Sequence, residues 1–325
     1  MNKKVKSTIF LLITAAVWGF AFVAQKLGTE HLGRFAFNGT RFLLGAVSLI
    51  PVILIFEGIS DFRRSKKLIG KTFLAAAIAG TVLFAASTFQ QMGIEITGNA
   101  GKVGFITALY TVLVPILNLI IFRTKTGRMT WLGIAVAVVG FYLLSIGKPP
   151  FVSADNALGF AFNSEITIGF GDVITLIGSV FWALHIITID RFAREIPSLK
   201  FACIQFFVCA ALCFVGAFSC ESFTLADISS AAIPILYCGI GSVGVAYTCQ
   251  ILGQRDAEPS TAAIICSSEA VFSAIGGALI LHEVMTVAGY VGCALIFIGM
   301  VVTQLPDSKR AKAKTASETE FCTKS

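Results

Sequence analysis

The feature that most constrains this chain is a series of apolar runs, each about 20 residues long, separated by short polar segments. A helix needs ~20 mostly apolar residues to cross the hydrocarbon core of a bilayer. Hydrophobic residues fill 56% of the 325 positions, whereas Asp, Glu, Lys and Arg fill only 13%. Such a chain cannot cover itself with a polar surface. The sequence therefore predicts an all-α integral membrane protein.

Hydropathy, with Gly, Pro and charged residues as boundaries, predicts ten transmembrane helices. The division between the last two depends on a tight turn at 282–285, which Glu283, Thr286 and Gly289 favour. The predicted ranges are 7–25, 36–56, 72–93, 100–122, 130–147, 171–189, 199–219, 231–252, 260–281 and 286–304.

Basic residues orient these helices. With the N-terminus inside, 20 of the 25 Lys and Arg residues lie on cytoplasmic segments. Cytoplasmic segments of membrane proteins carry an excess of Lys and Arg. We therefore expect a multi-pass protein of the cytoplasmic membrane with both termini in the cytoplasm. Four basic residues are placed outside and one within a helix: Lys26, Arg34, Lys102 and Lys148, and Arg41.

The two halves of the chain match weakly but in order, which indicates an internal repeat. Five helices are an odd number, so the halves should lie in opposite orientations in the membrane. The matches are Trp18 with Trp182 and Arg41 with Gln205 at an offset of 164, Gln90 with Gln250 and Gly93 with Gly253 at 160, and Gly133 with Gly292 and Gly140 with Gly299 at 159.

These matches divide the chain into four parts. Residues 1–147 form a first five-helix repeat and residues 171–304 a second, inverted one. Residues 148–170 are expected to be an extracytoplasmic linker. Residues 305–325 are expected to be a disordered basic tail in the cytoplasm, where each basic residue near anionic lipid would contribute ~1 kcal/mol of attraction.

Several local patterns resemble the EamA-type branch of the drug/metabolite transporter superfamily over nearly the whole chain. They are AAVWGFAFV around Trp18, TRFLLGA around Arg41, SSEAVFSAIGGALILHE around Glu269, and the Gly-rich last helix of each half. The resemblance implies ten helices in two inverted EamA-like repeats and transport of small metabolites, often outward. Two departures limit what it implies about substrate: Ala270 stands where the family often has Pro, and helix 6 carries a less usual His185.

Two charged residues within apolar runs are candidate substrate-binding residues, because a charge in hydrocarbon should face protein or a water-filled cavity. Glu269 lies ~14 Å into its helix and could exchange a proton or bind a cationic group. The alternative is a structural hydrogen bond between helices. Arg41 could bind a substrate carboxylate in a bidentate pair. Its alternative is to extend its long side chain to the interface.

The remaining candidates are polar or aromatic. Gln90 and Gln91 lie toward the outside, and inversion of the repeat places Gln205 and Gln250 toward the cytoplasm, so that the two groups would line opposite mouths of one cavity. Trp18 and Trp182 could form a gate or a stacking wall, or simply pack between helices. His185 could titrate near neutral pH or make an interhelical hydrogen bond.

Other patterns exclude function classes. Gly239 to Gly244 matches a dinucleotide-binding fingerprint, but it lies in an apolar run rather than after a strand, so close helix packing is predicted instead. The nine cysteines all follow residue 200 and show no zinc spacing. We predict no catalytic residues, metal or cofactor, and no nucleic-acid partner, because the basic residues form no aromatic-interleaved face.

The sequence thus favours a secondary transporter that moves a small metabolite by alternating access and acts as an exporter. Arg41 and Glu269 together favour an amino-acid-like zwitterion. The expected partners are this small-molecule substrate, the lipid bilayer and a coupling ion, either proton or sodium. The alternative is a lipid or carrier-lipid flippase of the same superfamily, and the oligomeric state stays open.

Overall fold

The computed structural model describes residues 3–56, 66–97, 100–124, 126–146, 169–192, 196–280, 287–303 and 305. These residues form helices and contain no strand. Up to residue 146 the helices are α1 (Lys3–Thr29), α2 (Arg34–Phe56), α4 (Lys66–Thr97), α5 (Ala100–Ala108), α6 (Tyr110–Phe122) and α7 (Arg128–Ile146). From residue 170 they are α8 (Phe170–Phe192), α9 (Ser198–Cys220), α10 (Leu225–Ser230), α11 (Ala232–Leu236), the π-helix η2 (Tyr237–Ala246), α12 (Tyr247–Gln254), α13 (Pro259–Ser267), α14 (Glu269–Ile280) and α15 (Val287–Thr303).

Seven helical segments within the described residues are long and apolar enough to cross a membrane. Two shorter apolar helices, at Arg128–Leu143 and Val287–Thr303, accompany them. By length and composition the chain is a multi-pass integral membrane protein. The seven segments are Lys3–Thr29, Arg34–Ile55, Ile69–Thr97, Val103–Phe122, Phe170–Phe192, Ser198–Cys220 and Ala232–Gln254.

Large apolar side chains cover the outside of the helix bundle. Ile55 and Phe218 are 75% and 76% exposed, and Ile120 and Leu279 are similarly placed. A contiguous apolar surface of this kind is rare on a soluble monomer but is the ordinary surface of a protein in lipid. The side chains that face outward therefore agree with a bilayer as the surrounding solvent.

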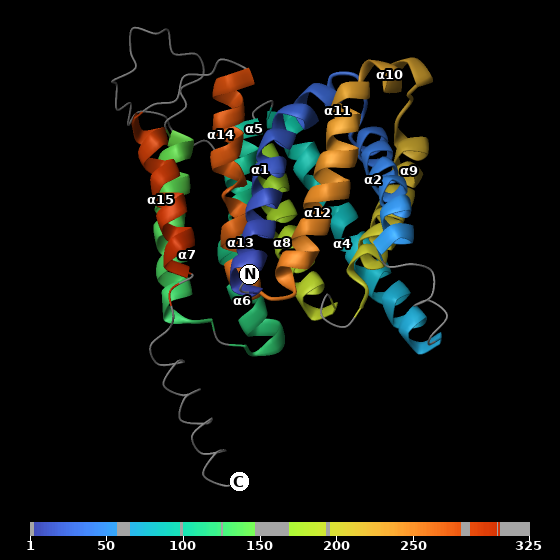
Figure 1. Ribbon diagram of the computed structural model, residues 1–325. Helices are drawn as coiled ribbons and strands as arrows, with labels where there is room; N and C mark the ends of the chain where they lie inside the picture. Colours follow the sequence, from blue (N-terminus) through green and yellow to red (C-terminus); the bar gives the residue numbers. More distant parts are fainter. Residues whose placement is uncertain are drawn as a thin grey trace, which may run out of the picture.

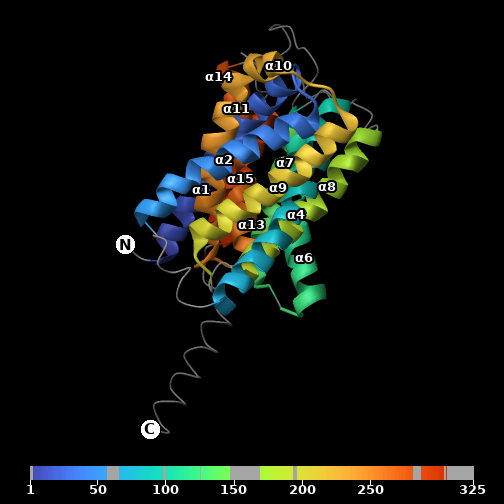
Figure 2. The same cartoon turned by 90° about the vertical axis from the view of Figure 1, so that its right-hand side faces the viewer.

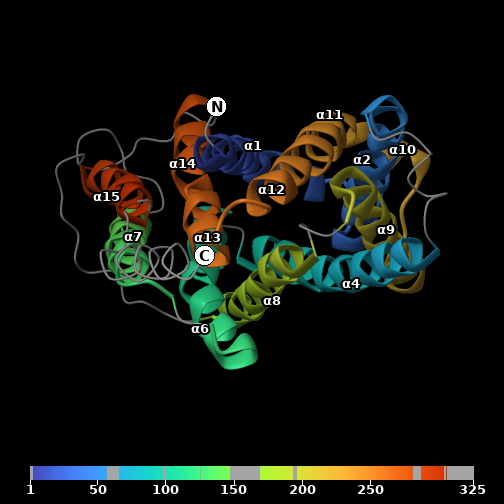
Figure 3. The same cartoon turned by 60° about the horizontal axis from the view of Figure 1, so that its bottom comes forward.

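The helices form one elongated bundle (Figure 1). α7 and α15 pair at one end of its long axis, and α2 packs against α9 at the other, as the view from below also shows (Figure 3). Between them α1 packs on α14 and on the segment from η2 to α12, while α8 packs on α4 and on α5 and α6. The short helix α10 lies at the end of the bundle opposite the N-terminus (Figure 2).

Two long segments are each interrupted by one residue. Leu109 separates α5 from α6, and its amide donates to the Ile106 carbonyl at 3.2 Å; Ser268 separates α13 from α14, and its amide donates to the Ile265 carbonyl at 3.2 Å. A bond to the third residue back tightens the turn and often marks a hinge. A serine hydroxyl also donates to each of these two carbonyls, from Ser179 at 2.8 Å and from Ser268 itself at 2.6 Å.

Glycines bring α7 and α15 together. A Cβ added at Gly133 would lie 2.6 Å from the carbonyl oxygen of Gly299, and one added at Gly299 would lie 2.6 Å from that of Gly133. About two turns further along α7, a Cβ added at Gly140 would lie 2.6 Å from the carbonyl oxygen of Gly292. Small residues let helix backbones approach closely, which is how helices gain packing energy when lipid surrounds them.

Within the described residues, helices occupy the ranges predicted from hydropathy except at Leu109, Ala231 and Ser268, and they extend further at several ends. α1 begins at Lys3 and α4 at Lys66, because basic first turns can continue a helix beyond the apolar core. The Gly239–Gly244 pattern lies in η2, where Gly239 packs on Leu44 and Gly244 on Ser48, so the prediction of close helix packing is confirmed.

Some predictions fall outside the described residues. These are the linker expected at 148–170 up to residue 168, the turn at 282–285 with Glu283, and the tail at 305–325 beyond residue 305. The helix ends expected at 147, 281, 286 and 304 also lie there.

The glycine contact between α7 and α15 predicts opposite effects for the same substitution at two positions. Gly140→Ala should lower the melting temperature in detergent, because a methyl group pressed on the Gly292 backbone costs roughly 1–3 kcal/mol. Gly70→Ala, in α4 with nothing within 4 Å of its added Cβ, should leave the melting temperature unchanged or raise it, since Ala favours helix over Gly by ~1 kcal/mol. Equal melting temperatures for the two variants would contradict the close contact.

Candidate functional site

A cavity lies at the centre of the bundle, where α1, α2, α4, α6, α8, η2, α12 and α14 meet. The space between its atoms, counted together with its open side, is about 430 Å³. The centre of a water molecule fits in only about 20 Å³ of this space. Little more than one water fits in such a space, so a substrate could enter only if helices moved. The cavity is lined by Trp18, Ala21, Phe22, Gln25, Arg41, Gln90, Tyr110, Trp182, Ile186, Ser242, Tyr247, Gln250 and Glu269.

The structure brings most of the candidates from the sequence to this cavity. Those that line it are Trp18, Arg41, Gln90, Trp182, Gln250 and Glu269. Gln91, His185 and Gln205 do not line it and lie behind its wall, although all three side chains are buried. Gln90 and Gln250, which the sequence placed toward opposite mouths, border the same cavity.

Three aromatic rings form one wall. The Trp18 ring lies 4.7 Å from the Tyr247 ring edge to face, and its centroid is 5.9 Å from that of Trp182. Trp182 stacks on Tyr247 with an interplanar angle of 18° and a centroid distance of 6.2 Å. Ring faces of this kind attract cationic groups as well as other rings. The two tryptophans that align in the sequence therefore contact each other and the same tyrosine.

Arg41 enters the cavity from α2. Its side chain is only 3% exposed, and its guanidinium lies 5.0 Å from the Phe42 ring centre and 5.6 Å from that of Phe37. The Cys238 thiol lies within hydrogen-bonding reach of the guanidinium, but the Arg41 Nε atom has no partner. Arg41 therefore does not reach an interface; it keeps a buried positive charge with a donor available to a ligand.

Glu269 lies on the other side of the cavity, at the first residue of α14. Its Oε1 atom accepts a hydrogen bond of 3.3 Å from the Tyr110 hydroxyl, and Tyr110 is the first residue of α6. This bond therefore joins the residues that directly follow the two helix breaks. Glu269 and Arg41 form no ion pair with each other in the described part of the chain.

Polar atoms without partners also face the cavity. Both the Nε2 and Oε1 atoms of Gln250 lack hydrogen-bond partners, as do Gln25 Oε1 and Trp182 Nε1. A buried polar group that makes no hydrogen bond costs ~1–3 kcal/mol. Donors and acceptors left in this state around one space are what a polar ligand or water would satisfy. Gln90 is weakly held, with its Nε2 donating to Thr107 Oγ1 at 3.5 Å.

The candidates behind the wall support the aromatic rings or the outer end of the bundle. His185 Nε2 lies 3.3 Å from Gln205 Oε1, and the His185 ring packs edge-on against Trp182 and Tyr247. This arrangement is the interhelical hydrogen bond that was one of the two expectations for His185. Gln91 Nε2 donates to the Gln25 carbonyl at 3.5 Å.

Seven lining residues were missed by the sequence predictions: Ala21, Phe22, Gln25, Tyr110, Ile186, Ser242 and Tyr247. Tyr247 lies one helical turn before Gln250, so a search of neighbouring turns could have found it. Tyr110 aligns with Glu269 at the offset of 159 that matches the late glycines, which was a usable signal. Gln25 is a polar residue near the end of a long apolar run, and only packing shows that it faces inward.

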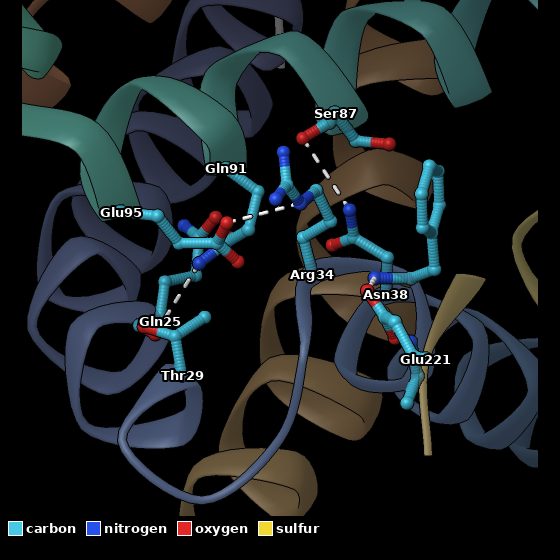
Figure 4. A network of polar contacts seen from close by, with 10 residues as sticks. Gln25, Thr29, Arg34, Asn38, Ser87, Gln91, Glu95 and Glu221 are labelled. Carbon is cyan, nitrogen blue, oxygen red and sulfur yellow. Dashed lines mark hydrogen bonds and ion pairs between the residues drawn. The ribbon is translucent and has the colours of Figure 1, made fainter. Parts of the chain in front are cut away.

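A second polar network joins α1, α2, α4 and α9 at the end of the bundle opposite the N-terminus (Figure 4). Arg34 Nε and Glu95 Oε2 form an ion pair of 3.0 Å, with the two side chains 32% and 24% exposed. The Glu221 carboxylate accepts the Phe35 and Ala36 amides at 2.9 and 2.8 Å, so it caps the first turn of α2. We call Arg34, Glu95 and Glu221 the outer network.

Two further hydrogen bonds lie near the outer network (Figure 4). Asn38 donates to the Ser87 carbonyl at 3.3 Å, and Gln91 donates to the carbonyl of Gln25, which lines the cavity. These bonds join α2 to α4 and α4 to α1. Within the described residues no group of three or more His, Cys, Asp or Glu side chains could hold a metal ion.

Comparisons with known proteins agree on one family. A model of the EamA-like transporter family matches residues 5–146 and 169–305. An uncharacterized transporter of Archaeoglobus fulgidus is 27% identical over 93% of this chain and 87% of its own length. The uncharacterized transporter YoaV of Bacillus subtilis is 22% identical over 94% and 99%. A solved crystal structure superposes with a TM-score of 0.73 at 17% identity, over 93% of this chain and 98% of that one, a likeness in fold alone.

The unpartnered amide of Gln250 predicts that one substitution will act oppositely at two buried glutamines. Gln250→Leu should raise the melting temperature of the ligand-free protein, because it removes two polar atoms that have no partner. Gln205→Leu should lower the melting temperature, because it leaves His185 Nε2 buried without its partner. The expected loss in unfolding free energy is about 1–3 kcal/mol. Both side chains are 0% exposed, so the comparison is matched. A drop for both variants would mean that Gln250 is already satisfied.

Proposed function

The chain belongs to the EamA-like transporter family, and on that premise we propose that it is a secondary transporter that exports a small, amino-acid-like metabolite across the cytoplasmic membrane. The observation that carries the proposal is the central cavity, in which a buried basic side chain, Arg41, and a buried acidic side chain, Glu269, line one space without forming an ion pair. The family and the names of its relatives point to a transporter rather than an enzyme.

The substrate class follows from the groups around the cavity. Arg41 presents an unpartnered donor for a carboxylate, and Glu269 presents a carboxylate for an ammonium group. The rings of Trp18, Trp182 and Tyr247 offer faces that attract a cation or an apolar side chain. A zwitterion with a modest side chain satisfies both charges at once, whereas a simple amine or a simple acid satisfies only one.

Ten transmembrane helices in two inverted repeats provide the frame for this proposal. Support comes from the two helix breaks: at an offset of 159 the bonds Leu109 to Ile106 and Leu113 to Leu109 correspond to Ser268 to Ile265 and Phe272 to Ser268. The same hydrogen-bond pattern thus recurs at equivalent positions of the two halves.

The glycine contact supports the same symmetry. Gly133 corresponds to Gly292 and Gly140 to Gly299 in the alignment of the halves. In space Gly133 lies against Gly299 and Gly140 against Gly292. Exchange of contacts between equivalent positions is what a two-fold relation produces. Two inverted halves also place both termini on one side, which we take to be the cytoplasm from the distribution of Lys and Arg.

Alternating access requires that the two ends of the cavity open in turn. We infer that the outer network holds one end closed, because its ion pair joins α2 to α4 and Glu221, directly after α9, caps α2. The residues that match Arg34 and Glu95 in the second half are Ser198 and Arg255, and these two cannot form an ion pair with each other. The Arg34–Glu95 ion pair is therefore not repeated at the matched positions.

Coupling to an ion gradient centres on Glu269. Its hydrogen bond with Tyr110 links the starts of α6 and α14, so a proton or a substrate ammonium on the carboxylate competes directly with a contact across the two helix breaks. Proton or sodium gradients are the available sources of energy, because the chain has no nucleotide-binding pattern.

The alternative of a lipid flippase requires a lateral path for lipid. The four residues expected to border a metabolite cavity, Trp18, Arg41, Gln90 and Glu269, all line the central cavity. This convergence of polar and aromatic side chains on one small space favours a small solute over a lipid.

The decisive experiment is flux into reconstituted vesicles with labelled amino acids, amines and carboxylic acids under imposed proton or sodium gradients. We expect flux of a zwitterion, and loss of at least tenfold in Arg41→Gln. Glu269→Gln should abolish the dependence of flux on the pH gradient, because it removes the titratable group. Lys26→Gln, at the last turn of α1 away from the cavity, is the control and should retain flux. Unchanged flux in Glu269→Gln at every pH would remove Glu269 from the mechanism.

The outer network makes a separate prediction about access. Glu95→Arg places two positive charges together and should speed the reaction of an impermeant maleimide with a Gln25→Cys reporter applied from outside. An exposed ion pair contributes up to ~1 kcal/mol, so the change should be about fivefold or more once repulsion is added. The double variant Arg34→Glu with Glu95→Arg should restore slow labelling. If reversal of both charges labels as fast as Glu95→Arg alone, the ion pair does not hold this end closed.

A further inference from the structure

A second pocket lies at the end of the bundle where α1 begins. It is open and much wider than the central cavity, with about 380 Å³ accessible to the centre of a water molecule. The first turns of α1 form one wall, and the end of α12 with the turn that follows it forms the other. Lys3 and Lys6 line it from α1, and Arg255 and Asp256 line it from that turn.

The charges around this pocket are unbalanced. In the part of the chain that the structure describes, no ion pair joins Lys3, Lys6 or Arg255 to a carboxylate. Asp256 is the single acidic side chain among the lining residues. The N-terminus of α1, a helix of 27 residues, adds the partial positive charge of its first amides. An anion that enters the pocket therefore meets an excess of positive charge.

Apolar side chains also line the pocket, and a hydrogen bond holds its two walls together. Phe10 and Leu252 belong to the lining, and the Lys6 ammonium lies 5.6 Å from the centre of the Phe10 ring. Ser7 Oγ donates to the Gly253 carbonyl at 2.6 Å, which ties α1 to α12 directly beside the pocket. The pocket thus combines basic and apolar side chains, as an amphiphilic ligand requires.

The length of α1 places Lys3 and Lys6, in its first turns, at the level of lipid headgroups. At 1.5 Å per residue its 27 residues span ~40 Å, about 10 Å more than the ~30 Å hydrocarbon core of a bilayer. Beside the pocket, Val5, Ile9 and Ile13 form an exposed apolar stripe along α1 with a spacing of four residues. This stripe runs from the basic residues of the pocket toward the middle of the membrane.

From these contacts we propose that the pocket binds the phosphate of an anionic phospholipid. Arg255 and the two lysines hold the phosphate, since guanidinium and ammonium groups are its usual partners. The side chains of Phe10 and Leu252 and the stripe on α1 contact the start of an acyl chain. Free phosphate would bind the same cations, but it would gain nothing from these apolar side chains. The site is independent of the transported substrate and does not rest on the proposed transport function.

The test is native mass spectrometry of the purified full-length chain in detergent, titrated with phosphatidylglycerol or with phosphatidylcholine of the same acyl chains. We expect tighter binding of phosphatidylglycerol to the parent protein. The double variant Lys6→Gln with Arg255→Gln should weaken it about 25-fold, since each basic residue near a lipid surface contributes ~1 kcal/mol, or about fivefold. Inorganic phosphate at millimolar concentration should not displace the lipid.

The control removes the same charge elsewhere at this end of the bundle. Lys71→Gln with Arg191→Gln, in the first turns of α4 and the last turn of α8, should bind phosphatidylglycerol like the parent. Equal losses in both double variants would replace the pocket with a diffuse surface charge effect. Equal affinity for both lipids would overturn the phosphate contact, and displacement by inorganic phosphate would assign the site to the free ion. The substituted side chains Lys6 and Arg255 are exposed, so both variants should fold, and the melting temperature of each checks this directly.

Discussion

The interior of a bilayer offers no hydrogen-bond partners, and this constraint organises the whole molecule. Each polar group at depth must be paired within the protein or held beside a space that a ligand or water can fill. Most backbone groups meet the requirement within helices, and the two carbonyls at the helix breaks also receive serine hydroxyls. Several buried side chains of the described residues carry atoms that do not meet it: Asn38 and Gln254 lie away from the cavity, and Gln250, Gln25 and Trp182 line it. Under the proposed function, a bound substrate would satisfy the unpartnered atoms at the cavity.

The contacts within the bundle distinguish rigid parts from parts that can move. The glycine contact between α7 and α15 brings backbone against backbone, so these helices can move only as a pair. The breaks at Leu109 and Ser268 are instead points where a helix has exchanged one regular bond for a tighter one. The residues immediately after them, Tyr110 and Glu269, are joined by a hydrogen bond. Under the proposed function, a ligand that binds the Glu269 carboxylate would therefore act on both helix breaks at once.

The sequence predicted the membrane class, the ranges of the helices and the central positions of Arg41 and Glu269, because each of these depends on local hydropathy or on charge at depth. It did not predict that Tyr247 would contact both Trp18 and Trp182. That contact depends on the π-helix η2 just before it, which shifts the angular position of every later side chain relative to a regular helix. The sequence also could not show which glutamines line the cavity. Gln90 and Gln91 are neighbours on one helix and point in different directions, and only packing shows that Gln90 faces the cavity. In the same way, only packing shows that Gln250 lines the cavity and Gln205 does not.

The two ends of the bundle show how divergence between similar halves can give a membrane protein a direction. Glu95 pairs with Arg34 at one end, whereas at the equivalent position of the other half Arg255 faces a pocket that it shares with two lysines. A neutral pair suits a mouth that must exclude water and ions while closed. Cations without carboxylate partners suit the face of the membrane where anionic lipid is concentrated, since lipid phosphate can supply the missing charge. Under our two proposals, the replacement of the Arg34–Glu95 pair by Ser198 and Arg255 at the matched positions leaves one end held by an ion pair and the other end bound to anionic lipid.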